Sequence, residues 1–291
     1  MENLVNALKT NRAFAFASAL VLLLILLALA APLIAPYDPL TAEMKNAYLP
    51  PSGEHLFGTD KLGRDCFSRI LYGASYSLSS VLLLVAVIFA VGTSLGVAAE
   101  YFGGKTDTVI MRISDMMISF PGMILAIAIA GILGGSLINA IIALTIVSWT
   151  KYARLARSMV LKIKKRDFVE AAVVNGGKPL HILSRHIVPN ILPLMVITAA
   201  SDIGAMMMEL AGLSFLGFGS QPPAPEWGLM LNEGRQQLQT APWLMVFPGL
   251  AIFVTVVIFN LWGDALRDVL DPRQKIKRLR LTQDSKNFSK I

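Results

Sequence analysis

Long apolar runs without Asp, Glu, Lys or Arg dominate the pattern of this chain, and short polar segments separate them. These runs cover residues 13–37, 70–99, 116–150 and 236–263. A helix needs about 20 apolar residues to cross a bilayer. The run 116–150 is therefore long enough for two helices, divided at Gly134-Gly135-Ser136, and an apolar stretch from 187 to 212 adds another. The pattern predicts an all-α membrane protein with six transmembrane helices, at about 13–35, 76–99, 113–133, 137–156, 190–212 and 243–263.

Composition supports a membrane protein. Hydrophobic residues make up 55% of the 291 residues and charged residues only 15%, whereas a soluble domain has about 25% charged residues. The first span is longer than the ~7–15 apolar residues of a signal peptide. Prolines also follow it where a cleavage site needs small residues, at Pro32, Pro36 and Pro39. We therefore expect the first span to be an uncleaved anchor.

The Lys and Arg residues of the polar segments predict how the chain is oriented. With the N-terminus inside, the inner segments hold 21 of the 26 basic residues and the outer segments hold 5. Cytoplasmic loops are enriched in basic residues, so both termini are predicted to lie inside. The net charge of +7 then reflects topology, not nucleic-acid binding. The predicted organisation is an N-terminal segment 1–12, a transmembrane domain 13–263 with outer loops 37–75 and 213–242 and an inner loop 157–189, and a basic tail 264–291.

The chain shows none of the patterns of an enzyme or a metal centre. Cys66 is the single cysteine, so no internal disulfide can form. His55, His181 and His186 lack the spacing of metal ligands, and no nucleophile elbow or phosphate-binding glycine loop occurs. We predict no catalytic, cofactor-binding or metal-binding residues in this chain.

The inner loop concentrates charge and helix-forming residues. The fourth helix is expected to continue inward, with basic residues such as Arg154 and Arg157 at the lipid headgroups. A short helix is expected over 168–174 and should end at Gly176, since glycine accepts the left-handed conformation of a helix terminus. Pro179 suits the first turn of a second short helix. Two short helices with small residues and one acid have two interpretations. They form either a protruding element that docks in a groove of a partner protein or a surface hairpin that only joins two spans.

Several motifs give this chain a family resemblance. Glu170, Ala171 and Ala172, then Gly176, then Pro189 thirteen residues later, resemble the EAA loop of ABC importer permeases. The family pattern places isoleucine and leucine before the proline, where this chain has Ile187-Val188, a departure that resembles the peptide/nickel branch. Four further segments resemble motifs of the C-type permease of dipeptide, oligopeptide and nickel importers. These segments are 33–39, 57–65, 226–228 and 263–272.

The resemblance implies a type I permease fold and a set of partners. These are a second homologous permease, two ATP-binding cassette ATPases that dock on the EAA loop, and an extracytoplasmic substrate-binding protein. ATP and Mg²⁺ would bind the ATPases, and this subunit would have no catalytic site or cofactor of its own. The implied location is the cytoplasmic membrane of a prokaryote, with several spans in the lipid bilayer and no nucleic-acid partner.

Asp202 and Glu209 stand out because they lie within the fifth predicted span. They are seven residues apart and therefore share one helix face, with Met206 between them. Acids at membrane depth face a bundle interior, an aqueous cavity or a partner. We predict that Asp202, Met206 and Glu209 line the translocation path or a subunit interface. Neither acid has an evident basic partner in its own span.

The substrate remains open at this stage between nickel, a metal chelate and short peptides. Segments 202–207 and 214–219 resemble nickel-type permeases slightly more than dipeptide ones. Nickel prefers imidazole or thiolate ligands, and the predicted spans contain no His or Cys, which favours a chelate over the bare ion. A secondary transporter and a non-transport scaffold are the alternative classes. A secondary transporter should show internal repeats, and a scaffold would not need acids within a span.

Overall fold

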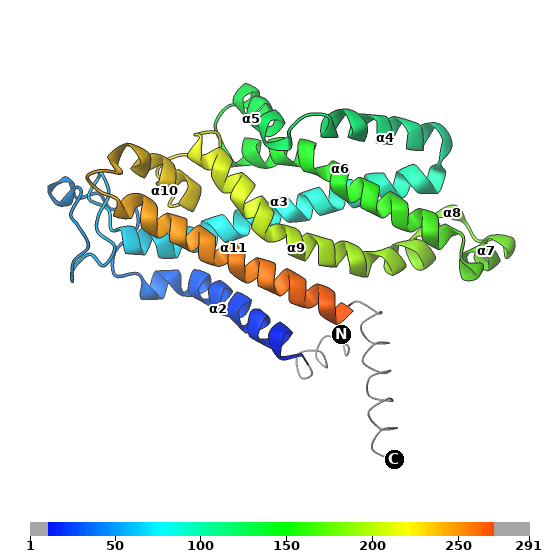
Figure 1. Ribbon diagram of the computed structural model, residues 1–291, viewed down its shortest axis with the longest axis horizontal. Coiled ribbons are helices and arrows are strands. Elements are labelled where there is room, and N and C mark those ends of the chain that lie inside the picture. The colour runs from blue at the N-terminus through cyan, green and yellow to red at the C-terminus, as the bar shows by residue number, and fades with distance from the viewer. Residues whose placement is uncertain (1–10, 271–291) are drawn as a thin grey trace, which may run out of the picture.

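The structure, a computed structural model, describes residues 11–270 and consists of helices arranged in an elongated bundle (Figure 1). The predicted segment 1–12 and tail 264–291 lie largely outside these residues. The longer helices are α2 (Arg12–Ile34), α3 (Cys66–Phe102), α4 (Gly104–Ile118), α5 (Gly122–Leu133), α6 (Leu137–Lys164), α9 (Val188–Phe215) and α11 (Trp243–Leu270). Shorter segments are η1 (Met44–Asn46), α7 (Asp167–Val174), α8 (Pro179–Ile182), the π-helical η2 (Leu183–Ile187), α10 (Trp227–Gly234) and η3 (Arg235–Gln237).

The all-α class is confirmed, and the count of six spans stays a prediction. Four helical stretches in the described chain are long and apolar enough to cross a membrane: α2, α3, α8 to α9, and α11. A fifth is added if α4 and α5 together form one broken span. Helix α6 is not among them, because Lys151 and Arg154 interrupt its apolar sequence. Helix α3 starts at Cys66, ten residues before the predicted start at residue 76.

The predicted third span, 113–133, is not one helix. Helices α4 and α5 meet at an angle of 95° across residues 119–121. Pro121 explains the break, since the α conformation is disfavoured for the residue before a proline, here Phe120. The break predicted at Gly134-Gly135-Ser136 is confirmed: Gly134 ends α5, and the Ser136 side chain caps α6 by accepting from the N–H of Asn139.

Small residues bring α3 and α6 together at the centre of the bundle. A Cβ on Gly92 would lie 2.5 Å from the carbonyl oxygen of Trp149. A Cβ on Gly96, one turn later, would overlap the backbone of Ala153. Small residues four apart allow this close backbone approach in membrane helices. The glycine pair therefore fixes where α6 lies against α3.

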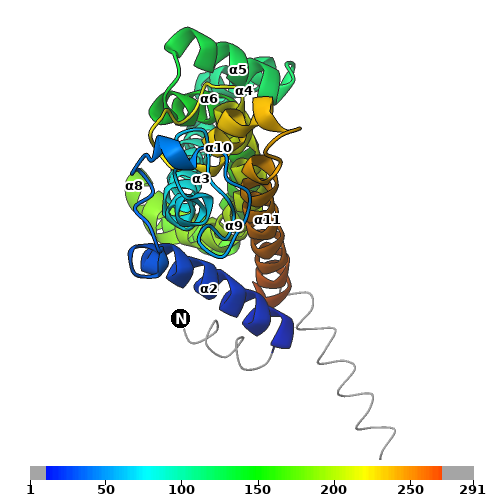
Figure 2. The same ribbon diagram turned by 90° about the vertical axis from the view of Figure 1, so that its left-hand side faces the viewer.

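Two apolar clusters form the core on either side of this contact. One is shared by α3, α5, α6 and α9, and the other by α2, α3, α9, α10 and α11. Helix α2 lies along the side of the bundle next to α11 and α3 (Figure 2). Helices α7 and α8 form one end of the molecule, and α10 with the segment 35–65 forms the other (Figure 1). These two ends carry most of the candidate functional residues.

Candidate functional site

A helical hairpin, residues 167–187, joins α6 to α9 at one end of the bundle. Helix α7 ends as the sequence predicts: Gly176 has φ +76°, and its N–H donates to the carbonyl of Val173 at 3.0 Å. The N–H of Gly177 donates to the carbonyl of Ala172, also at 3.0 Å. This pair of bonds is the Schellman motif, which satisfies the free carbonyls of a helix terminus. Pro179 starts α8 in its first turn, as expected.

The hairpin is anchored to the helices beneath it. Val169, Ile182 and Ile187 are at most 3% exposed and belong to the apolar cluster of α3, α6 and α9. The Tyr101 hydroxyl at the end of α3 donates to the carbonyl of Pro179 at 2.9 Å. Such anchoring means that a force applied to the hairpin reaches the ends of three long helices.

The outer surface of the hairpin is open and partly apolar. Val174 is 86% exposed and Leu180 is 76% exposed. Glu170, Ala171, Gly176 and Pro189 are also exposed, and Ala172 is half-buried. A groove of about 640 Å³ runs between the hairpin and the end of α3, lined by Tyr101, Phe102, Lys164, Val169, Glu170, Val173, Val174, Pro179, Ile182 and Ile187. Of the predicted coupling residues, only Glu170 lines this groove.

The basic residues of α6 next to the hairpin bind other helices. Arg154 pairs with Asp115 at 2.6 Å, and Nη2 of Arg157 donates to Asp107 at 2.7 Å, so both join α6 to α4. Lys164 donates to the carbonyls of Glu100 and Tyr101, at the C-terminus of α3. These side chains therefore make contacts within the protein, since α4 lies along α6, and a position of Arg154 and Arg157 at the lipid headgroups stays a prediction.

Asp202 has partners on a neighbouring helix that its own sequence segment could not show. Its Oδ1 accepts from Nζ of Lys151 at 2.6 Å, and its Oδ2 accepts from the hydroxyl of Tyr152 at 3.0 Å. Asp202 is buried, whereas Glu209, two turns along α9, is partly exposed. Met206 lies between them and packs against both apolar clusters. Lys151 lies in α6, within the predicted fourth span 137–156.

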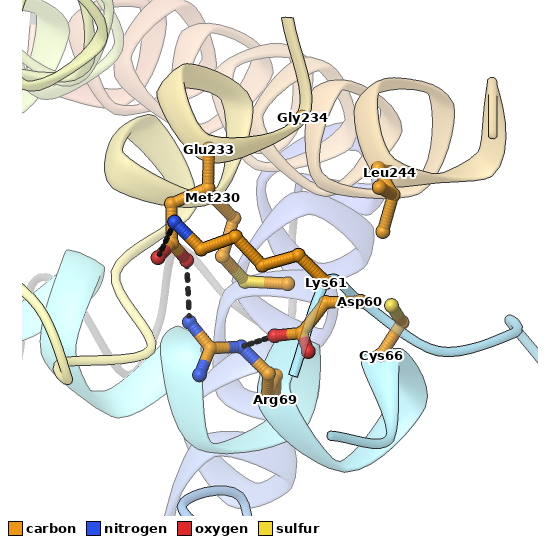
Figure 3. Close-up of a pocket in the computed structure, with 8 residues that line it drawn as sticks. All are labelled: Asp60, Lys61, Cys66, Arg69, Met230, Glu233, Gly234 and Leu244. Carbon is orange, nitrogen blue, oxygen red and sulfur yellow. Dashed lines mark hydrogen bonds and ion pairs between the residues drawn. The ribbon is translucent and has the colours of Figure 1, made fainter. Parts of the chain in front are cut away.

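The opposite end of the bundle is held by a network of ion pairs. Glu233 of α10 accepts from Arg64 at 3.2 Å and from Arg69 at 3.1 Å, and lies 3.4 Å from Lys61. Arg64 also pairs with Asp60 at 2.6 Å. Figure 3 shows the Arg69 guanidinium paired with both Glu233 and Asp60, each through a different nitrogen. The two arginine side chains are at most 2% exposed, so the network fastens the outer loop to α3 and α10.

Helix α10 starts at a residue pair that the sequence motif 226–228 singled out. The Glu226 carboxylate caps the helix by accepting from the N–H groups of Gly228 and Leu229, each at 2.8 Å. Burial raises the pKa of the Glu226 carboxyl, and these two bonds oppose the rise. Trp227 is 3% exposed and donates from Nε1 to the carbonyl of Ile70 at 3.0 Å. The indole of Trp227 is therefore packed against α3 and joins it to the start of α10.

Comparison with known proteins identifies the chain. Residues 90–276 match the family described as binding-protein-dependent transport system inner membrane component. Residues 4–51 match the N-terminal transmembrane domain of oligopeptide transport permease C. The chain belongs to the family of ABC importer permeases. Its relatives place this permease in the peptide and nickel branch.

Three curated relatives illustrate that branch. The nickel transport system permease protein NikC of Escherichia coli K12 is 42% identical over 237 residues, 81% of this chain and 86% of the relative. The dipeptide transport system permease protein DppC of Alkalihalophilus pseudofirmus is 45% identical over 248 residues, 85% and 82% of the two chains. The glutathione transport system permease protein GsiD of Escherichia coli O6:K15:H31 is 47% identical over 243 residues, 83% and 80%.

A solved structure supports the fold. A chain of the MetNI methionine ABC transporter, in an inward-facing conformation, matches with a TM-score of 0.57 and 21% identity. The match covers 70% of this permease and 98% of that chain. At this identity the likeness concerns the fold alone.

Proposed function

We propose that this permease forms half of the transmembrane pore of an ATP-driven importer. A second, homologous permease completes the pore, two ATPase subunits bind the hairpin, and an extracytoplasmic binding protein delivers the solute. The solute is a short peptide or a nickel chelate. The names of the relatives support this range, because they cover nickel, dipeptide and glutathione transport systems.

The observation that carries the proposal is the exposed surface of the hairpin. Val174 and Leu180 are the most exposed of its large apolar side chains, and Val174 lies one turn after exposed Glu170 on α7. Adjacent exposed apolar residues with a polar border indicate a protein contact. The base of the hairpin is packed into the core through Val169 and Ile187. An ATPase bound here would therefore move α6 and α9 with the hairpin.

The substrate range is narrowed by ligand chemistry. Nickel prefers imidazole nitrogen or thiolate sulfur. Among residues 11–270, no three His, Cys, Asp or Glu side chains are placed to hold a metal ion. This favours a peptide or a chelated metal over bare Ni²⁺ as the transported species.

Co-purification and a matched pair of glycine variants test the proposal. The tagged permease should bring down a second permease and ATPase subunits, and the complex should take up solute into proteoliposomes only with ATP. Gly176→Trp places a large side chain on the hairpin surface, where a Cβ meets open space. It should abolish ATPase binding while the partner permease is retained.

Gly134→Trp is the control for this experiment. Gly134 also has a positive φ, +87°, and open space around its Cβ position, but it lies between α5 and α6, away from the hairpin. This variant should keep its ATPases. Purification of the permease without any ATPase, or equal ATPase binding by both variants, would contradict the proposed function.

A further inference from the structure

The Lys151–Asp202 pair lies halfway along two long helices. Lys151 is 14 residues from the start of α6, and Asp202 is 14 residues from the start of α9. At 1.5 Å per residue, each lies about 21 Å from the end of its helix. Helix α9 belongs to a stretch long and apolar enough to cross a membrane, and Lys151 meets Asp202 halfway along it. Charged side chains at such a position are costly and face protein or water instead of lipid.

The two partners differ in exposure. The Lys151 side chain is 62% exposed, while the Asp202 side chain is 10% exposed. Both oxygens of Asp202 are occupied, by Lys151 and by Tyr152. An ammonium group has three N–H donors, and within the described chain Lys151 uses only one. Lys151 therefore presents two free donors on the open side of the α6–α9 contact.

Glu209 supplies a complementary charge on the same side. It lies seven residues after Asp202 on α9, about 10.5 Å along the axis, and within electrostatic reach of Lys151. In the described chain its carboxylate makes no hydrogen bond or ion pair. Ala205 lies between Asp202 and Glu209 on α9, and its small side chain is exposed. One surface thus carries a cation with free donors and an unpaired carboxylate.

We propose that Lys151 and Glu209 are substrate contacts on the translocation path, where Lys151 binds the carboxylate of a passing peptide and Glu209 binds its amino group. Nζ of Lys151 lies 2.6 Å from Asp202, and Asp202 is about 10 Å from Glu209 along the helix axis. An extended chain spans about 3.3–3.6 Å per residue, so this spacing matches a peptide of three residues. Asp202 and Tyr152 are positioning residues that hold the ammonium group at the surface of α6. This inference rests on the proposed function and assigns its solute class and contact residues.

A cysteine reporter tests the site in the complete importer. Ala205→Cys is introduced in the purified complex and labelled with the anionic reagent 2-sulfonatoethyl methanethiosulfonate. The native Cys66 is 1% exposed and provides a low background. The control is Ile142→Cys, which is exposed on α6 but lies nine residues from Lys151 and hence on the opposite helix face. The probes are L-alanyl-L-alanyl-L-alanine, its C-terminal amide and NiCl₂, added directly at millimolar concentration.

The site predicts a specific pattern of protection. The anionic reagent should label Ala205→Cys but not Ile142→Cys, and L-alanyl-L-alanyl-L-alanine should slow the labelling. The amide and NiCl₂ should not protect. A Lys151→Gln background should raise the half-protecting peptide concentration about tenfold, because a charged hydrogen bond is lost. Lys151→Arg should keep most of the protection.

Other outcomes overturn the site. Labelling of Ala205→Cys by N-ethylmaleimide but not by the anionic reagent would show that lipid or another subunit covers this face. Three results would show that Lys151 does not bind the peptide carboxylate. They are equal protection with and without Lys151, equal protection by the amide, and protection by NiCl₂ alone. If Ala205→Cys fails to assemble, Thr198→Cys, two turns away on the same face of α9, replaces it. Co-purification of the ATPases is scored first, so failure of the proposed function is seen separately.

Discussion

Replacing Val174 by serine should weaken ATPase binding without destabilising the permease. Val174 is 86% exposed in the last turn of α7, and valine and serine have similar helix propensities. Burying a valine side chain in an interface contributes about 1.5 kcal/mol, the lower end of the range for large apolar side chains. Since 1.4 kcal/mol corresponds to a factor of ten, the dissociation constant should rise about tenfold.

The control for this prediction is one turn away on the buried side of the same helix. Val169 is 2% exposed, so Val169→Ser removes core contacts and buries a hydroxyl. It should cost about 2–4 kcal/mol of permease stability. The assay titrates purified ATPase subunits against the detergent-solubilised permease pair and records thermal melting in parallel. A Val174→Ser variant with wild-type affinity, or with a lowered melting temperature, would refute the docking surface.

Three further predictions concern other parts of the chain. Gly176→Val should lower the melting temperature more than Gly176→Asn, because the left-handed backbone at φ +76° costs L residues about 1–2 kcal/mol and asparagine tolerates it best. Glu233→Gln should cost about 3–5 kcal/mol in thermal unfolding, since it leaves two buried arginines without a full counter-charge; an unchanged melting curve would show that the network adds no stability. In intact cells, a membrane-impermeant thiol reagent should label Ser52→Cys but not Lys164→Cys, and labelling of the second would reverse the orientation drawn from the basic residues.

Local helix signals made part of the fold predictable. The end of α7 at Gly176 and the start of α8 at Pro179 follow from backbone preferences that act within one turn. The end of α5 at Gly134 follows from the same kind of local backbone preference. Pro121 carried the same kind of signal for the bend between α4 and α5, but the apolar run through it was taken as one span.

Contacts between distant segments were not predictable from one sequence. Lys151 and Asp202 are 51 residues apart, and their meeting depends on how α6 lies against α9. The continuation of the fourth helix beyond residue 156 is predictable from the sequence, and α6 does continue to Lys164. The indole of Trp227 likewise fills a site against α3 that only the folded chain forms.

Photocrosslinking from the hairpin tests the central claim most directly. A p-benzoylphenylalanine at Val174, in the complex purified from cells, should form a covalent product with an ATP-binding subunit on irradiation. The same residue at Leu250, which is 51% exposed on the apolar part of α11, should not. A product with an ATPase only at Val174 is the result that our account predicts. No ATPase product at Val174, in a complex that still transports solute, would contradict it.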